Sequence, residues 1–130
     1  MTSPPRIVVI VDDDVSFREA LAGLVAAFGF RAVAFPSAAA YLESGALQHT
    51  ACLISDVNMP GVGGIDLYDR LAALEARVPT IFVSGAPDRR TRAAALSRGV
   101  TGYLAKPVDP DELFRLILRS VDMDQPPAGF

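Results

Sequence analysis

The sequence predicts an α/β domain in which a parallel, doubly wound sheet is covered by helices on both faces. Four short apolar runs and a weaker fifth alternate along the chain with longer segments of helical periodicity. Strands that are apolar throughout are typical of parallel sheets, because both of their faces are buried. Right-handed crossovers between such strands place helices on both sides of the sheet. The 130 residues suffice for one domain of this kind and are too few for two.

The first half of the chain contains three predicted strands, at residues 7–11, 31–35 and 52–55. A helix should follow the first strand, because apolar residues recur there at helical spacing, at Phe17, Ala20, Leu21, Leu24 and Phe28. Gly29 is expected to end this helix. After the second strand, Ser37 is the expected N-cap of a short helix, since its hydroxyl can accept a backbone N–H bond.

The second half contains two further strands, at residues 80–83 and 102–105, and three helices. Glycine and proline in residues 58–64 predict a loop before the third helix, whose buried face should hold Leu67, Leu71 and Leu74. Asp88 is the expected cap of the fourth helix, in which Leu96 is the main large apolar residue. A cap, a proline and acidic residues at 109–112 start the fifth helix, with an apolar stripe at Leu113, Ile117 and Val121.

These signals divide the chain into a flexible N-terminus at residues 1–5, a domain at residues 6–121 and a linker or disordered tail at residues 122–130. The net charge of −3 gives no reason to expect nucleic-acid binding by this domain. Cys52 is the single cysteine, so no internal disulfide can form, which fits a reducing, cytoplasmic location. No signal peptide and no apolar run of the ~18 residues of a transmembrane helix is visible, so no membrane contact is expected.

Polar residues stand where four of the predicted strands end. Asp12 and Asp13 follow the first strand, Asp56 ends the third, Ser84 the fourth and Lys106 the fifth. The carboxyl ends of parallel strands lie at one edge of the sheet, and open α/β sheets bind ligands in the crevice there. We therefore expect three carboxylates, a hydroxyl and an ammonium group to converge at one site.

This set of side chains predicts phosphoryl transfer with a magnesium ion. Clustered carboxylates repel one another, and Mg²⁺, which prefers oxygen ligands, removes the repulsion. Asp56 stands alone at its strand end and is the predicted nucleophile, because a carboxylate can form an acyl phosphate. Lys106 and Ser84 would then contact phosphoryl oxygens. The simpler alternative, that the acids at 12–14 only favour a helix start, leaves the other strand ends unexplained.

Taken in order, these motifs resemble the receiver domain of bacterial two-component response regulators. The resemblance covers nearly the whole chain and rests on Asp12-Asp13, Asp56 followed by Met59-Pro60 and Gly64, Ser84-Gly85, and Tyr103 before Lys106-Pro107. It implies a flavodoxin-like fold with five parallel strands in the order 2-1-3-4-5. It also implies a signalling receiver that is no enzyme in its own right and catalyses only its own phosphorylation and dephosphorylation.

The resemblance further implies the roles of the acidic residues. Asp56 would accept the phosphoryl group from a sensor histidine kinase or a small phosphodonor. Asp13, Asp56 and the backbone carbonyl of Asn58 would bind Mg²⁺ directly, with Asp12 acting through water. Lys106, joined to Pro107 by a cis bond, would contact the phosphoryl group.

How the signal leaves the domain is implied in the same way. Ser84 would move toward the phosphoryl group, and Tyr103 would rotate inward, which changes the face formed by the fourth helix, the fifth strand and the fifth helix. The residues near Arg18 and Phe35 are similar to the subgroup that precedes a LuxR-type helix-turn-helix. A DNA-binding output domain outside this chain, transcription regulation and a homodimer on phosphorylation are therefore expected. The arginines at 89, 90 and 92 belong either to this face or to a solvated helix surface.

Two other functions use overlapping residues. A phosphatase of the haloacid dehalogenase type would use Asp12 and Asp14 in an Asp-x-Asp-x-Val motif, but the last acidic motif of that class is missing and Asp56 is left without a role. A phosphate-independent interaction module would be expected to lack Asp56 or Lys106, and both are present.

Overall fold

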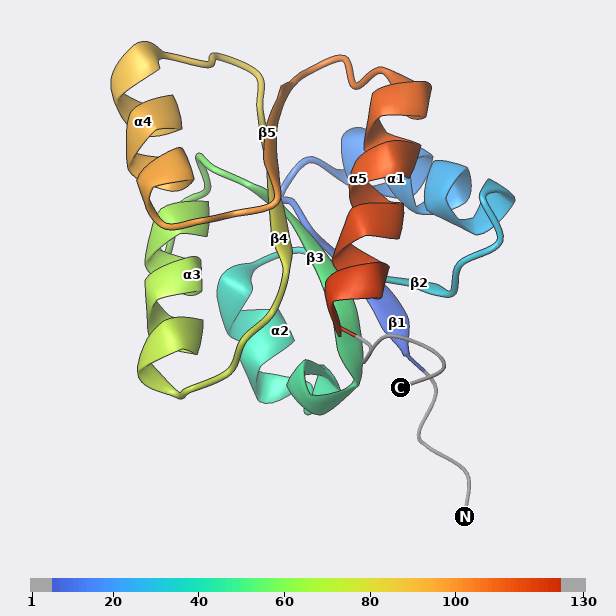
Figure 1. The fold of residues 1–130 in the computed structure, drawn as a ribbon, viewed down its shortest axis with the longest axis horizontal. Coiled ribbons are helices and arrows are strands. Elements are labelled where there is room, and N and C mark those ends of the chain that lie inside the picture. The colour runs from blue at the N-terminus through green and yellow to red at the C-terminus, as the bar shows by residue number, and fades with distance from the viewer. Residues whose placement is uncertain (1–5, 125–130) are drawn as a thin grey trace.

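Five parallel strands form one sheet in the order β2-β1-β3-β4-β5, which confirms the predicted fold class and strand order (Figure 1). The structure is a computed structural model and describes residues 6–124. The strands are β1 (Ile7–Val11), β2 (Ala32–Phe35), β3 (Thr50–Asp56), β4 (Thr80–Ser84) and β5 (Gly102–Ala105). The expected flexible segment at residues 1–5 and the last part of the expected tail, residues 125–130, lie outside the described residues.

The connecting helices are α1 (Val15–Ala27), α2 (Ala38–Glu43), α3 (Gly64–Ala73), α4 (Arg89–Ser97) and α5 (Pro110–Asp124). Two predicted caps are observed: Ser37 Oγ accepts the Ala40 N–H at 3.1 Å, and Asp88 Oδ1 accepts the Thr91 N–H at 2.8 Å. Gly29 follows α1 with φ of 99°, a left-handed conformation that glycine adopts without steric cost. These local signals therefore set where the helices begin and end.

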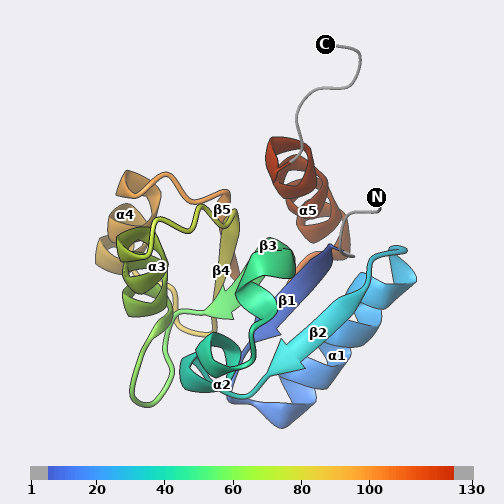
Figure 2. The same cartoon turned by 90° about the horizontal axis from the view of Figure 1, so that it is seen from below.

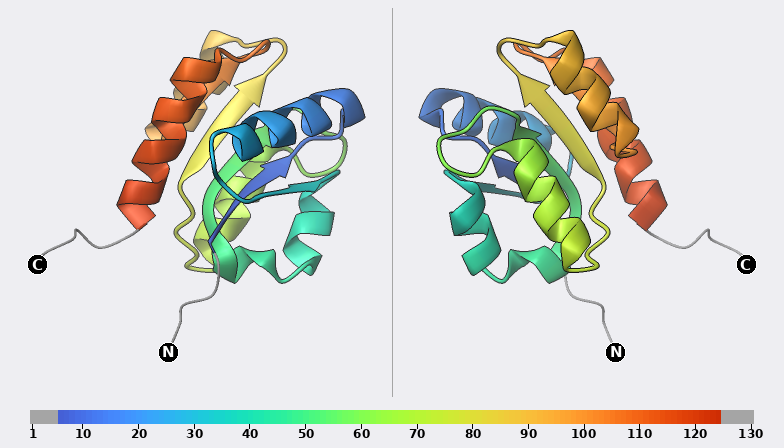
Figure 3. Two further views of the ribbon diagram at one scale, coloured as in Figure 1. Left: turned by 90° about the vertical axis from the view of Figure 1, so that its right-hand side faces the viewer. Right: turned by 90° about the vertical axis from the view of Figure 1, so that its left-hand side faces the viewer.

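Alternate residues of each strand face opposite sides of the sheet, so a fully apolar strand supplies two cores. On one side, Ile10 of β1 packs in a cluster with Leu21 of α1 and Ile117 of α5. On the other side, Val9 of β1 packs in a cluster with Leu67 of α3. Figures 2 and 3 show α1 and α5 covering one face, and α2, α3 and α4 covering the other.

The structure differs from the sequence-based expectations at several places. β3 begins at Thr50 rather than at residue 52. β2 begins at Ala32 rather than at residue 31, and a 3-10 helix, η1 (Ala46–His49), precedes β3. Leu74, expected on the buried face of α3, is 64% exposed because α3 ends at Ala73 and the backbone of Glu75 turns away with φ of 59°. α5 continues to Asp124, beyond the domain limit expected at residue 121.

α4 is held by few apolar contacts. Ala95 is its one buried residue and packs in a cluster with Phe82 and Tyr103, whereas Leu96, the expected anchor, is 45% exposed. The C-terminal end of α4 is joined to α3 instead, because the Arg98 guanidinium donates two hydrogen bonds to Asp69, at 2.8 and 3.0 Å. An exposed ion pair of this kind contributes only about 0.2–1 kcal/mol. α4 is therefore an element that can shift at low cost.

None of the helices in the described part of the chain combines the length and the apolar character that crossing a bilayer requires.

Candidate functional site

The register of the sheet brings the predicted site residues to one edge. Val11 lies opposite Ser55 in the β1–β3 pair, so Asp12 follows beside Asp56. Asp56 lies opposite Val83, one residue before Ser84. Ser84 in turn lies opposite Ala105, one residue before Lys106. The strand ends thus place these four side chains next to one another, as the sequence predicted.

Three carboxylates gather at this edge with different exposure to solvent. Asp12 is 1% exposed and Asp56 is 7% exposed, whereas Asp13 is exposed. Each offers an oxygen atom, and these oxygen atoms lie within 4.8 Å of one another. Hard oxygen ligands at this spacing fit a magnesium ion, which is usually held by one or two carboxylates together with waters and phosphate. The acidic cluster therefore has the donor set of a divalent-cation site.

Lys106 reaches into the acidic cluster from β5. Its ammonium nitrogen lies 2.9 Å from Asp12 Oδ2 and 3.3 Å from Asp56 Oδ2. The Lys106 backbone N–H donates to the Ser84 carbonyl oxygen at 2.8 Å, and the Lys106–Pro107 peptide bond is cis, as expected. One cation thus bridges two buried carboxylates that follow different strands, β1 and β3.

The environment moves the pKa of both Asp56 and Lys106 upward. Burial raises the pKa of Asp56, and the charge of Asp12 adds to the rise, while the Asn58 N–H bond and Lys106 partly offset it. Burial alone would lower the pKa of Lys106, but its hydrogen bond to Asp12 and the charges of both carboxylates raise that pKa overall. Lys106 therefore stays charged, and it favours the ionised form of Asp56.

The loop after β3 shapes the surroundings of Asp56. The exposed Asn58 donates its backbone N–H to Asp56 Oδ1 at 3.1 Å. Gly64 begins α3 directly beneath, where a Cβ atom would lie 2.5 Å from the Asp56 backbone oxygen. Any larger residue would push α3 away from the strand end, so the motif glycine is required by packing.

Ser84 is buried at the end of β4, and Tyr103 is buried on the neighbouring strand β5, three residues before Lys106. Ser84 Oγ accepts the Ala86 N–H at 3.2 Å, which leaves its own proton free to point elsewhere. The Tyr103 ring is only 7% exposed, and its hydroxyl has no hydrogen-bond partner among the described residues. The ring is therefore already buried, whereas the resemblance to receiver domains implied that it rotates inward on phosphorylation. The Arg92 guanidinium of α4 lies 5.9 Å from the centre of this ring.

Asp14 does not join the acidic cluster. Its side chain is the N-cap of α1, where Oδ1 accepts the Phe17 N–H at 3.1 Å. A phosphatase that relies on Asp12 and Asp14 needs both carboxylates at the reacting phosphorus, so the geometry does not favour this alternative.

Two contacts at the site were not foreseen from the sequence. Phe17 had been assigned only to the apolar stripe of α1, yet its ring centre lies 4.1 Å from the Lys106 ammonium nitrogen. Arg18 donates to the Asp12 backbone oxygen at 2.8 Å. Both residues lie in the first turns of α1, the helix that follows Asp12 and Asp13. A position this close in sequence to the acidic residues is the feature that could have predicted their contact with the site.

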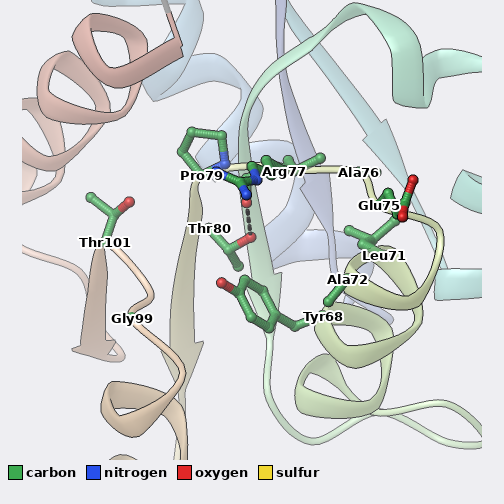
Figure 4. Close-up of a pocket in the computed structure, with 11 residues that line it drawn as sticks. Tyr68, Leu71, Ala72, Glu75, Ala76, Arg77, Pro79, Thr80, Gly99 and Thr101 are labelled. Carbon is green, nitrogen blue, oxygen red and sulfur yellow. Dashed lines mark hydrogen bonds between the residues drawn. The ribbon is translucent and has the colours of Figure 1, made fainter.

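A separate cavity of about 890 Å³ lies at the other end of β4 (Figure 4). It is lined by residues of α3, by Thr80 at the start of β4 and by Thr101 before β5. The Thr80 hydroxyl donates to the Val78 carbonyl at 2.8 Å, so its proton is already used within the protein. None of the carboxylates of the acidic cluster lines this cavity, which therefore is not the predicted site.

Comparisons with known proteins match the chain to one family of signalling domains. The family model of the response regulator receiver domain matches residues 8–118. The chain is 35% identical over 123 residues to nodulation protein W of Bradyrhizobium diazoefficiens, which covers 95% of this chain and 54% of that protein. It is 31% identical over 121 residues to the transcriptional regulatory protein FixJ of the same organism, covering 93% of this chain and 59% of that protein.

The fold comparison agrees with the sequence comparison. The solved structure of the response regulator StyR superimposes with a TM-score of 0.80 and 32% sequence identity, covering 93% of this chain and 61% of that one. The chain spans about half the length of the first curated relatives that it matches.

Proposed function

Since this chain belongs to the response regulator receiver domain family, we propose that it accepts a phosphoryl group on Asp56 and uses the resulting change in its surface to control an output. One observation carries the choice of residue: Asp56 shares the Lys106 ammonium with Asp12, within a cluster of three carboxylates at the sheet edge. Phosphoryl transfer depends mostly on positioning and on charge neutralisation, and both are built into this arrangement.

The proposed reaction needs an ionised carboxylate at Asp56. One of its oxygens attacks the phosphorus atom of the donor and forms a new P–O bond. The P–N bond of a phosphohistidine, or the P–O bond of an acyl phosphate, breaks, and its electron pair leaves with the donor nitrogen or oxygen. The Asn58 N–H and the Lys106 ammonium both stabilise the charged carboxylate against the cost of its burial. The domain in this way catalyses its own phosphorylation.

The acidic cluster is the proposed site of a magnesium ion. Asp13, Asp56 and the backbone carbonyl of Asn58 would hold it directly, with Asp12 acting through water. When bound, the ion neutralises charge on the phosphoryl oxygens. Lys106 would supply positive charge to the same group, and the Ser84 hydroxyl, whose oxygen accepts the Ala86 N–H, would donate its proton to a phosphoryl oxygen.

We propose that α4, β5 and α5 form the face that reports phosphorylation. Movement of Ser84 toward the phosphoryl group changes the wall of the space that holds Tyr103, and Tyr103 contacts Arg92 of α4. Few apolar contacts hold α4, so a small change at Tyr103 can displace it. The displaced face would then form a homodimer or release an output domain.

The rest of the protein is inferred from its relatives. Because the chain spans about half the length of the curated relatives it matches, and one of them is a transcriptional regulatory protein, we propose a DNA-binding output domain of the LuxR type. A sensor histidine kinase would supply the phosphoryl group, and the cytoplasm is the proposed location of the exchange.

The central test is direct labelling. Incubated with phosphoramidate and Mg²⁺, the chain should gain the mass of one phosphoryl group, because a small donor needs no kinase docking. Intact-protein mass spectrometry measures the gain, and peptide analysis locates it. Labelling that is absent, or that lies on a residue other than Asp56, contradicts the proposal.

The output face can be tested with beryllofluoride, which mimics a bound phosphoryl group. Amide hydrogen exchange should change around Tyr103 and along residues 89–98, because Tyr103 contacts Arg92 and Ala95 of α4 and the proposed signal passes from Ser84 through Tyr103 to that helix. The amides of α2, on the same side of the sheet but away from α4, serve as the internal control. Changes confined to the vicinity of Asp56 would show that another face carries the output.

A further inference from the structure

Phe17 makes a contact that its place in the apolar stripe of α1 does not explain. The Lys106 ammonium nitrogen lies 4.1 Å from the centre of its ring, well within the ~6 Å over which a cation is attracted to an aromatic face. The same nitrogen is bonded to Asp12 and Asp56. An ammonium group has three N–H donors, and two carboxylates use two of them. The ring face is therefore the third partner of this cation.

A chain of contacts that begins and ends at Asp12 holds Phe17 in this position. Asp12 Oδ1 accepts the Asp14 N–H at 2.8 Å, and Asp14 Oδ1 accepts the Phe17 N–H at 3.1 Å. The Phe17 ring then meets Lys106, and Lys106 returns to Asp12 through Oδ2. The acidic residues after β1 thus fix the backbone position of Phe17 through the start of α1, and Asp12 also bonds the cation that the ring meets. Phe17 also packs against the core beneath α1 and α5, which restricts its rotation.

Lys106 needs such a restraint. A lysine side chain is a flexible four-carbon stem that can take many conformations. The Lys106 side chain also borders an apolar groove lined by Phe17, Leu24 and Val108. Gly85 also lines the groove, and because it has no Cβ atom it lacks the contact that one would make with Lys106 Cδ at 3.8 Å. Without the ring, the ammonium group has free space beside the site into which it can move.

We propose that Phe17 is a positioning residue for phosphoryl transfer, because its ring holds the charged Lys106 over Asp12 and Asp56. The inference rests on the proposed function of Asp56 and adds the residue that keeps its cation in place. The ring does not touch the reacting atoms and acts only through Lys106. By restricting the motion of the ammonium group before the reaction, the ring lowers the entropy that is lost when Lys106 contacts the phosphoryl oxygens.

The test compares Phe17→Leu, which keeps an apolar side chain but removes the ring, with Phe17→Tyr, which keeps the ring. With phosphoramidate and Mg²⁺, Phe17→Leu should be labelled about threefold to tenfold more slowly than wild type, and Phe17→Tyr within about twofold of it. Phe28→Leu is the matched control, because Phe28 lies at the end of the same helix and its ring contacts Phe114 instead of Lys106. It should be labelled at the wild-type rate.

A second measurement separates positioning from a general loss of structure. In NMR spectra, the Lys106 side-chain protons next to the ammonium group should be shifted upfield by the Phe17 ring in wild type, in Phe17→Tyr and in Phe28→Leu. The shift should disappear in Phe17→Leu. Its persistence there, or a Phe17→Leu rate equal to wild type, overturns the proposal, and so does an equally slow Phe17→Tyr.

Failure of this inference can be distinguished from failure of the proposed function. If wild type itself is not labelled on Asp56, the function is wrong. If wild type is labelled and Phe17→Leu is labelled equally fast, the function stands and the role of Phe17 is wrong.

Discussion

Asp56→Asn is expected to abolish phosphoryl incorporation. The amide cannot act as the nucleophile, and removing a nucleophile typically slows a reaction by orders of magnitude, so labelling should fall by at least about a hundredfold. Mass spectrometry after exposure to phosphoramidate and Mg²⁺ measures the loss. Asp66→Asn is the matched control, because Asp66 is an exposed acid in the first turn of α3 and lies outside the acidic cluster. Equal labelling of Asp56→Asn and wild type would show that Asp56 is not the phosphoacceptor.

The same variant should be more stable than wild type when no metal is added. The raised pKa of Asp56 means that, between about pH 4 and that pKa, the folded state binds more protons than the unfolded state. The free energy of unfolding therefore falls as the pH rises through this window, and above it the ionised carboxylate destabilises the fold. Asparagine cannot ionise, so at pH 7 thermal unfolding should show a higher Tm for Asp56→Asn, by a few degrees.

A stability gain of this kind also serves as the control for the loss of labelling. A variant that unfolds at a higher temperature has not lost activity through misfolding. An unchanged or lower Tm at pH 7, together with an unchanged pH dependence, would contradict the charge argument for Asp56.

Asp13→Asn is expected to weaken Mg²⁺ binding by about tenfold or more, because the variant loses one negative charge of the acidic cluster and offers only a neutral amide oxygen in place of a carboxylate. Calorimetric titration with Mg²⁺ measures the affinity. Phosphorylation should slow in parallel, and EDTA should stop it in wild type, because the remaining carboxylates repel the phosphoryl group when no cation offsets their charge.

Asp14→Asn is the matched control for this second prediction. It removes the neighbouring negative charge, but asparagine remains a good N-cap, so α1 should keep its start. Its Mg²⁺ affinity should stay close to that of wild type. If Asp14→Asn weakens binding as much as Asp13→Asn does, the effect is one of net charge and Asp13 is not a ligand.

The fold class and the residue types at the site could be predicted from the sequence alone. Apolar runs and helical spacing are local patterns, and so are the caps at Ser37 and Asp88, which the structure reproduces. The position of Asp56 at a strand end was predicted in the same way, since parallel strands end at one edge of the sheet. These features follow from the spacing of apolar residues and from the direction of each strand, and both can be read from a short segment of the sequence.

Which side chains contact one another could be seen only once the segments were packed together. Lys106 bonds to Asp12 across a separation of 94 residues, and Phe17 lies against that same lysine. Of the two acids that follow Asp12, Asp13 joins the cluster while Asp14 caps α1. Leu74 is exposed although its spacing fits a buried stripe. Each outcome depends on how helices pack on the sheet and where they end, because contacts between distant segments are selected by packing and are not encoded in any local pattern.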